Sequence, residues 1–153
     1  MKKILLVVSV VLLALFSLIL YRNWRVQNSP YQEFFLTGTF PYPLPDGFHN
    51  GSIQALETPW KGKIFEASSS SGINVFEGDK KNYSFKIYKG KGLKDKNLDV
   101  LKIDYNLAEN PFWVRFILDE LVQNAPGKYT GKVHLLINPN FSLSLGFFRL
   151  ERR

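Results

Sequence analysis

The chain has 153 residues and a formal net charge of +7, from 20 lysine and arginine side chains against 13 aspartate and glutamate side chains. It contains no cysteine, which excludes disulfide bonds, thiolate metal sites and a cysteine nucleophile. Its 13 Phe, 7 Tyr and 3 Trp residues exclude a disordered chain, because so many large apolar side chains favour a packed core.

Residues 4–21, ILLVVSVVLLALFSLILY, form an apolar run of eighteen residues without a charge. A helix of this length covers about 27 Å, which is close to the thickness of the hydrocarbon core of a bilayer. Basic and aromatic residues flank the run: Lys2 and Lys3 precede it, and Tyr21, Arg22, Trp24 and Arg25 follow it. Such flanks are typical of a spanning helix, so we predict a single-pass signal anchor over residues 1–25.

Two alternatives to a retained anchor fit this sequence less well. A cleaved signal peptide has a shorter apolar core followed by small residues, whereas Leu20, Tyr21 and Trp24 are large. A buried helix of a soluble domain normally shows a polar face, which this run lacks. The positive-inside rule favours a cytoplasmic N-terminus by a narrow margin and therefore an extracytoplasmic C-terminal domain.

Beyond Arg25 the chain has 128 residues, which is enough for one domain with a core. Residues 26–35 are predicted to be a tether and residues 36–153 a barrel-like β domain. The first part of this domain is rich in turn formers. Pro45-Asp46-Gly47 predicts a turn, because proline presets φ and glycine accepts positive φ.

Alternating apolar residues, the signature of β-strands, run through most of the remaining chain. The segments with this pattern are 52–57, 63–67, 83–87, 101–105, 133–137 and 141–147. Short connections predict six to eight mostly antiparallel strands. In the last segment we expect Phe141, Leu143, Leu145 and Phe147 to point inward, with Ser142, Ser144 and Gly146 on the other face.

One segment departs from the alternation. Asn110 is a candidate N-cap, Pro111 suits the first helical position, and Pro126-Gly127 would end the element. We therefore predict a helix over residues 111–124 that covers the β domain. The fold class expected is mainly β: an N-terminal transmembrane helix followed by a small antiparallel β-barrel or curved sheet with one covering helix.

Two glycine pairs enclose an aromatic residue. Segments 47–51, GFHNG, and 127–131, GKYTG, each place two glycines four residues apart. Glycine at such positions allows a sharp bend or a close approach of another group to the backbone.

Several motifs together resemble an uncharacterised family of small bacterial proteins. They are Pro59-Trp60-Lys61-Gly62-Lys63-Ile64-Phe65, Asn74, Ile103-Asp104-Tyr105-Asn106 with Asn110-Pro111, Asp119-Glu120, Pro126-Gly127-Lys128-Tyr129-Thr130-Gly131 and Phe147-Phe148-Arg149-Leu150. The resemblance covers nearly the whole chain after the anchor. It implies a calycin-like (lipocalin-like) β fold and implies no activity.

Two clusters of polar residues are candidates for metal binding or catalysis. His49 and His134, completed by Asp104, would make a metal site, but two surface histidines are the favoured interpretation. Asp104, Arg115 and Asp119, with Tyr105 and Glu120, would suit acid–base catalysis, but ordinary ion pairs are favoured. We therefore assign no catalytic residue, metal or cofactor.

The segment from Lys80 to Lys96 has many lysines. Nucleic acid is not the expected partner, because the domain beyond the anchor carries only 16 basic against 13 acidic residues. Contact with anionic lipid headgroups is the functional interpretation, through Lys89, Lys91, Lys94 and Lys96. A solvated hairpin whose lysines discourage edge pairing is the simpler alternative.

The leading functional hypothesis is a non-enzymatic membrane protein whose barrel binds an apolar or amphiphilic molecule. The expected partners are thus membrane lipid and an apolar small molecule. The aromatic residues assigned to the binding site are Trp60, Tyr105, Trp113, Phe116 and Tyr129. The alternatives are a membrane-tethered interaction module with a filled core and a small enzyme built on Asp104, Arg115 and Asp119.

Overall fold

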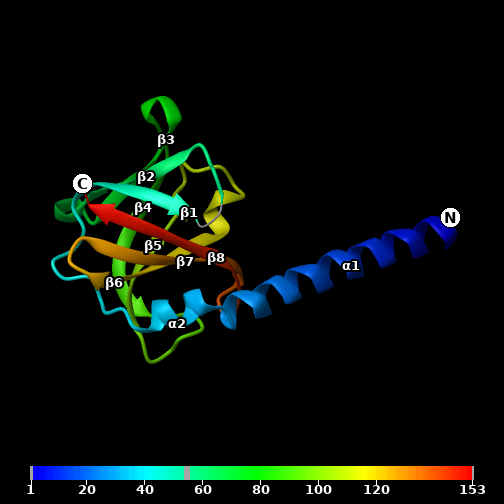
Figure 1. Ribbon diagram of the computed structural model, residues 1–153. Coiled ribbons are helices and arrows are strands. Elements are labelled where there is room, and N and C mark those ends of the chain that lie inside the picture. The colour runs from blue at the N-terminus through cyan, green and yellow to red at the C-terminus, as the bar shows by residue number, and fades with distance from the viewer. Residues whose placement is uncertain (1, 54–55, 153) are drawn as a thin grey trace.

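The computed structural model describes residues 2–53 and 56–152, and it consists of a long N-terminal helix attached to a barrel (Figure 1). Helix α1, Lys2–Gln27, is continuous, and it is long and apolar enough to cross a membrane. The side chains of its apolar run lie outside the barrel and are exposed. Helix α2, Pro30–Leu36, follows at once, with Ser29 as N-cap and Pro30 in the first turn.

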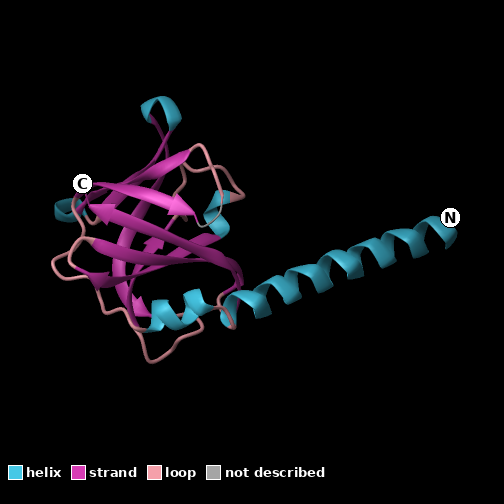
Figure 2. Ribbon diagram, viewed as in Figure 1, coloured by secondary structure: helices cyan, strands magenta, loops and turns pink. Residues whose placement is uncertain are grey.

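Eight strands in the described residues form a closed antiparallel barrel (Figure 2). They are β1 (Gly47–Ile53), β2 (Trp60–Glu66), β3 (Ser71–Phe76), β4 (Lys80–Lys91), β5 (Asp99–Asp104), β6 (Ile117–Ala125), β7 (Lys128–Asn138) and β8 (Phe141–Arg152). Short 3-10 turns lie at η1 (Ala67–Ser69), η2 (Glu77–Asp79) and η3 (Val114–Phe116). Each strand pairs with the next, and β8 closes the barrel by pairing with β1. The prediction of a mainly β fold with an antiparallel barrel behind an N-terminal apolar helix is confirmed.

The prediction of a helix over 111–124 is wrong. Asn110-Pro111 leads into the single turn η3, and residues 117–125 form strand β6. Both faces of β6 are buried: Leu121 points into the barrel, while Leu118 and Val122 lie on the outer wall. With apolar side chains on both faces the alternation is lost, and the segment imitates a broad helical face. The helix that covers the barrel is instead α2.

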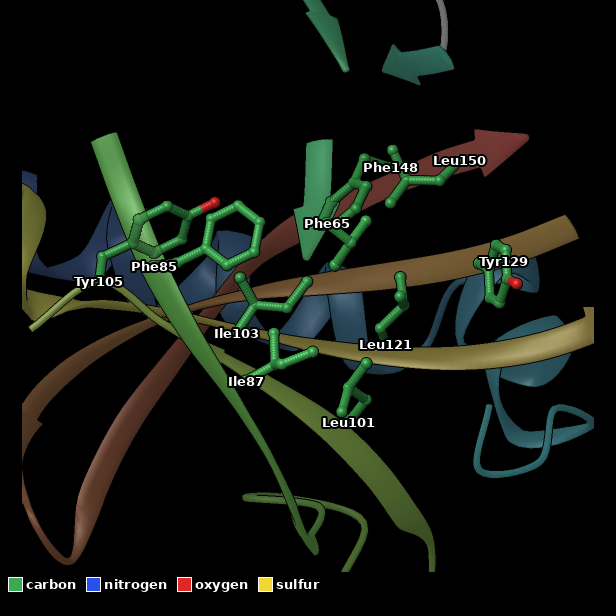
Figure 3. Close-up of a cluster of buried hydrophobic side chains, with 10 residues drawn as sticks. All are labelled: Phe65, Phe85, Ile87, Leu101, Ile103, Tyr105, Leu121, Tyr129, Phe148 and Leu150. Atoms are coloured by element: carbon green, nitrogen blue, oxygen red, sulfur yellow. The ribbon is translucent and has the colours of Figure 1, made fainter. Parts of the chain in front are cut away.

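The barrel interior is filled by side chains that alternate along the strands (Figure 3). The buried set is Phe65, Phe85, Ile87, Leu101, Ile103, Tyr105, Leu121, Tyr129, Phe148 and Leu150. The second glycine of each predicted pair makes room for a ring of this interior. A Cβ at Gly131 would lie 2.0 Å from the Phe148 ring, and one at Gly51 would lie 2.4 Å from the Trp60 ring. Glycine at these two positions therefore permits the aromatic packing.

The register of β8 differs from the prediction because of a bulge. His134 pairs with Ser144 and Val133 with Gly146, so Leu145 is an extra residue between them. Leu143 is buried as predicted, but Leu145 is only partly buried and Phe147 packs on the outer wall. After the bulge, Phe148 and Leu150 are the residues that fill the interior.

Helix α2 covers the outer wall of the barrel. Phe35 is fully buried there against Val100 and Val122, and its ring lies 6.0 Å from that of Phe147. Ser142 and Ser144 of β8 are also buried, with Ser144 facing α1. The predicted outward face of β8 is therefore covered by helices.

Candidate functional site

A groove lies between the base of α1 and strand β8. It consists of two adjoining cavities of about 270 and 570 Å³, which share Arg22, Ile53, Leu145, Gly146 and Phe147. The smaller cavity is also lined by Trp60, Lys63, Asp119, Val133 and Phe148, and the larger by Arg25, Val26, Ser29, Pro30, Tyr31 and Leu56. The groove thus contains two arginines from the C-terminal part of α1 and two charged residues of the barrel.

The bulge in β8 forms one wall of the groove. Arg22 Nε donates to the carbonyl oxygen of Leu145 at 2.9 Å, and Ser144 N donates to Asn23 Oδ1 at 2.8 Å. Side chains of α1 thus satisfy backbone groups at the irregular part of the strand. Gly146 has no side chain, so the space beside Arg22 stays open.

The floor of the groove is a buried ion pair. Lys63 Nζ lies 3.1 Å from Asp119 Oδ2, donates to Asn74 Oδ1 at 2.9 Å, and forms a short hydrogen bond with the Tyr105 hydroxyl group. The Tyr105 hydroxyl in turn donates to Asp119 at 3.1 Å. Three acceptors therefore match the three N–H donors of the ammonium group. This arrangement makes Lys63 a polar floor of the groove rather than a free nucleophile.

Aromatic rings surround the Lys63 ammonium. Its Nζ atom lies 5.0 to 5.5 Å from the ring centroids of Trp60, Phe85, Tyr105 and Phe148, within the range of cation–π attraction. Burial lowers the pKa of Lys63, while the Asp119 carboxylate opposes that shift. Burial also raises the pKa of the Tyr105 hydroxyl well above its usual value, so it stays a hydrogen-bond donor.

A second polar network, the anchor joint, lies on the outer wall beneath the helices. Its members are Gln27, Gln32, Asp95, Lys102, Glu120, Lys132, His134 and Ser144. Lys132 Nζ lies 2.9 Å from Asp95 and 3.2 Å from Gln27 Oε1, and Gln32 donates to Asp95 at 2.8 Å. These bonds attach both helices and the β4–β5 loop to the barrel.

Three members of the anchor joint have the order of a hydrolase triad. His134 lies 3.1 Å from Glu120 through Nε2 and 3.3 Å from Ser144 Oγ through Nδ1. Ser144 is fully buried, however, and its hydroxyl accepts a hydrogen bond from Gln27. A nucleophile must reach its substrate, and the buried Ser144 does not; the hydrogen bond from Gln27 instead holds α1 against β8.

The anchor joint is expected to make the barrel sensitive to acid. Burial by itself would raise the pKa of Glu120, but the hydrogen bond and charge of His134 and the charge of Lys102 outweigh it and lower the pKa to about 2, from 4.5. A carboxylate with a lowered pKa in the folded state stabilises the fold above pH 4.5, and this contribution is lost as the pH falls towards 2. We expect a loss of about 3 kcal/mol over this interval.

This expectation is checked by guanidinium unfolding of the detergent-solubilised protein at several pH values. The Glu120→Gln variant, which cannot titrate at this position, is the control and should be less stable than wild type at pH 6. The difference between the two proteins should shrink as the pH approaches 2. A constant difference across that range would contradict the assignment.

The structure brings together some of the aromatic residues predicted to bind a ligand. Trp60 lines the groove, and Tyr105 belongs to its floor. Tyr129 is buried in the interior, with its ring 5.4 Å from that of His49. Trp113 and Phe116 lie on the loop between β5 and β6 and line neither cavity of the groove. The five predicted residues therefore lie in three separate places: the groove, the barrel interior and the loop between β5 and β6.

The lysines predicted to contact lipid differ in their surroundings. Lys89 and Lys91 are on β4 and form ion pairs with Asp99, at 3.3 and 2.7 Å. Lys94 lies 5.7 Å from the centre of the Phe141 ring, and Lys96 is exposed.

The alternative catalytic site is not assembled. Asp104 lies on the outer wall, where it accepts from Tyr88 at 3.2 Å, and Asp119 lies inside the barrel. Arg115 bonds to Asn106 at 3.1 Å, and it lies on η3 while Asp119 lies on β6. Asp119 pairs with Lys63 rather than with Arg115, because residues 111–124 do not form the predicted helix.

The predicted metal-binding alternative is not assembled either. His49 packs edge-on against Phe65 inside the barrel, whereas His134 is on the outer wall. Both are buried, so the interpretation of two surface histidines is also wrong. Among the described residues, no three histidine, aspartate or glutamate side chains are grouped closely enough to hold a metal ion.

Sequence reasoning missed Lys63, Asn74 and Arg22 as parts of the site. Lys63 stands two residues before Phe65 in an alternating segment, so it occupies an inward position. A lysine at a position where the alternation places apolar side chains is the sequence signal for a buried polar site. In the sequence Arg22 is a basic residue that flanks the apolar run, and nothing near it indicates its hydrogen bond to the Leu145 carbonyl oxygen.

Comparisons of the chain with known protein families, with characterised proteins and with solved structures found no match. The resemblance to a calycin-like family remains a prediction, and the function must be argued from the geometry of the site.

Proposed function

We propose that the protein is a membrane-anchored, non-enzymatic β-barrel that binds an amphiphilic molecule with an anionic head and an apolar chain. The observation that carries this proposal is the groove, which begins at Arg22 and Arg25 and ends at Lys63 and Asp119. Between these ends the walls are mainly apolar, with Ile53, Leu145 and Phe147 common to both cavities.

The position of the two arginines supports an anionic head. They directly follow the apolar run of α1, so they lie at headgroup level when the helix spans a bilayer. A lipid-like molecule would then reach the groove from the membrane without crossing water. With the N-terminus in the cytoplasm, the barrel and its groove lie on the extracytoplasmic side.

The size of the groove supports a small ligand. Its two cavities, of about 270 and 570 Å³, together match the size of a typical small-molecule pocket. The barrel interior itself is filled, so the ligand binds at the side of the barrel rather than in its centre. An up-and-down barrel of eight strands supports kinship with calycin-like proteins, which we propose on this ground.

A second candidate function is a membrane-tethered interaction module. The filled interior favours it, because a packed barrel leaves no central cavity for a ligand. In that case the groove would hold no small molecule, and the outer surface would bind another protein.

The proposal is tested by binding of a brominated single-chain fatty acid to the full chain in nanodiscs. Trp24 and Trp113 are exposed, and both are replaced by phenylalanine so that Trp60 is the remaining tryptophan, which is excited selectively. We expect saturable quenching of Trp60, because it lines the groove. Replacing Arg22 and Arg25 by glutamine should weaken binding roughly tenfold or more, if each cation contributes about 1 kcal/mol.

The matched control replaces Lys80 and Lys81, two exposed lysines at the start of β4 and outside the groove, by glutamine. It removes the same charge and should leave the affinity unchanged. Absence of saturable quenching would overturn ligand binding and favour the interaction module. Equal weakening in both double variants would mean that net charge, not the groove, attracts the fatty acid.

A further inference from the structure

The end of the barrel nearest the anchor carries an exposed apolar cluster outside the groove. We call it the aromatic rim, and it consists of Phe112, Trp113, Phe116, Ile137 and Phe141. Phe112 and Trp113 are 72% and 67% exposed, although their size would favour burial. Three rim residues lie on the loop between β5 and β6, and two lie at the β7–β8 hairpin.

The two parts of the aromatic rim adjoin each other. A hollow of about 420 Å³ is lined from the loop by Phe112 and Phe116 and from the hairpin by Leu136 and Ile137. The Phe112 and Phe116 rings are in edge contact, with centroids 5.0 Å apart. The loop and the hairpin thus share one hollow with a mainly apolar lining, and exposed apolar surface of this kind marks an interaction site.

The anchor keeps the rim at membrane level. In Figure 1 the yellow η3 segment and the β7–β8 hairpin lie on the side of the barrel from which α1 extends. Arg22, which directly follows the apolar run, donates a hydrogen bond to the carbonyl oxygen of Leu145. Phe141 precedes Leu145 by four residues, which is about 13 Å along a strand. The rim therefore lies close to where α1 would leave the hydrocarbon core.

The charges around the rim suit an anionic surface. Arg115 lines the hollow, and Lys94 Nζ lies 5.7 Å from the centre of the Phe141 ring. Glu109 is the acidic residue of the same loop, so the two cations outnumber it. Aromatic side chains beside basic ones are typical of segments that enter the headgroup region.

We infer that the aromatic rim inserts into the interface of the bilayer that α1 spans, with anionic lipid as its partner. This contact goes beyond ligand binding, since it needs no ligand in the groove. The barrel would then be held at two places, the end of α1 and the rim. Its groove would face the headgroups at a constant orientation.

The test uses single cysteines, since the chain has none of its own. An environment-sensitive dye is attached at Asn140→Cys, at the hairpin tip beside the rim, in the full chain in phosphatidylcholine–phosphatidylglycerol vesicles. Ser68→Cys is the matched control, because it is exposed on the β2–β3 connection at the opposite end of the barrel. Leu12→Cys reports insertion of α1. Brominated lipid and aqueous iodide are the quenchers.

At position 140 we expect blue-shifted emission and at least about twofold stronger quenching by brominated lipid than at position 68. Replacing Phe112 and Trp113 by aspartate in the Asn140→Cys protein should abolish that quenching. Both residues are exposed, so the barrel should remain folded, which near-ultraviolet circular dichroism would verify.

Iodide quenching at position 140 equal to that at position 68 would overturn the inference. Protection from iodide without quenching by brominated lipid would point to a second copy of the chain and would also overturn it. Quenching at position 12 in every variant separates failure of the rim from failure of the anchor. Quenching of Trp60 by the brominated fatty acid reports ligand binding in the groove independently of insertion of the rim and of α1.

Discussion

Replacing Lys63 by methionine is expected to lower the free energy of unfolding by about 3–5 kcal/mol. The substitution leaves the Asp119 carboxylate buried without its cation, at a site where both side chains are almost fully enclosed. It also removes the donor to Asn74 and Tyr105. Guanidinium unfolding in detergent, followed by near-ultraviolet circular dichroism, measures the change.

Two variants make this result specific to the buried charge. The double variant Lys63→Met with Asp119→Leu removes both charges and should recover most of the lost stability. Lys61→Met removes an exposed ion pair with Glu77, at 3.0 Å, and should cost less than about 1 kcal/mol. If the double variant were as unstable as Lys63→Met, packing rather than the unpaired carboxylate would explain the loss.

Replacing Leu150 by alanine is expected to cost about 2–5 kcal/mol. Leu150 is fully buried in the barrel interior, so its truncation leaves a cavity among Tyr129, Phe148 and their neighbours. Thermal or guanidinium unfolding of the two proteins measures the difference.

Leu145→Ala is the matched control for Leu150→Ala, since both remove the same atoms from β8. Leu145 is the extra residue of the bulge and lines the groove, so its truncation should cost less than about 1.5 kcal/mol. It should instead change the affinity for a fatty acid. Equal destabilisation by the two variants would contradict the register described for β8.

The difference expected between Leu150→Ala and Leu145→Ala depends on the bulge in β8, which no local sequence pattern indicates. Residues 141–147 alternate strictly, and from alternation alone Leu145 belongs with Leu143 on the inward face. The bulge shifts the second half of the strand by one residue, because α1 supplies partners for the backbone of Ser144 and Leu145. Those partners are more than a hundred residues away in the chain.

Strand β6 and the groove also depend on contacts between segments that are distant in the chain. Glu120 and Leu118 are on the outer wall, where exposed polar residues would ordinarily reveal a strand, but helices and a loop cover that wall. Apolar and polar residues of β6 therefore occur on both faces, and the strand does not show the usual alternation. Lys63 and Asp119 meet across the interior from different hairpins, so no spacing in the chain relates them.

The apolar helix and the antiparallel β class can be predicted from the amino-acid sequence alone. Both depend on short-range properties: an eighteen-residue run without charge, and alternation between short connections. Three features become visible only in the folded protein: the helix that covers the barrel, the register shift in β8 and the residues that form the groove. These features arise from burial on both sides of a strand and from bonds between distant segments, and local periodicity carries no information about either.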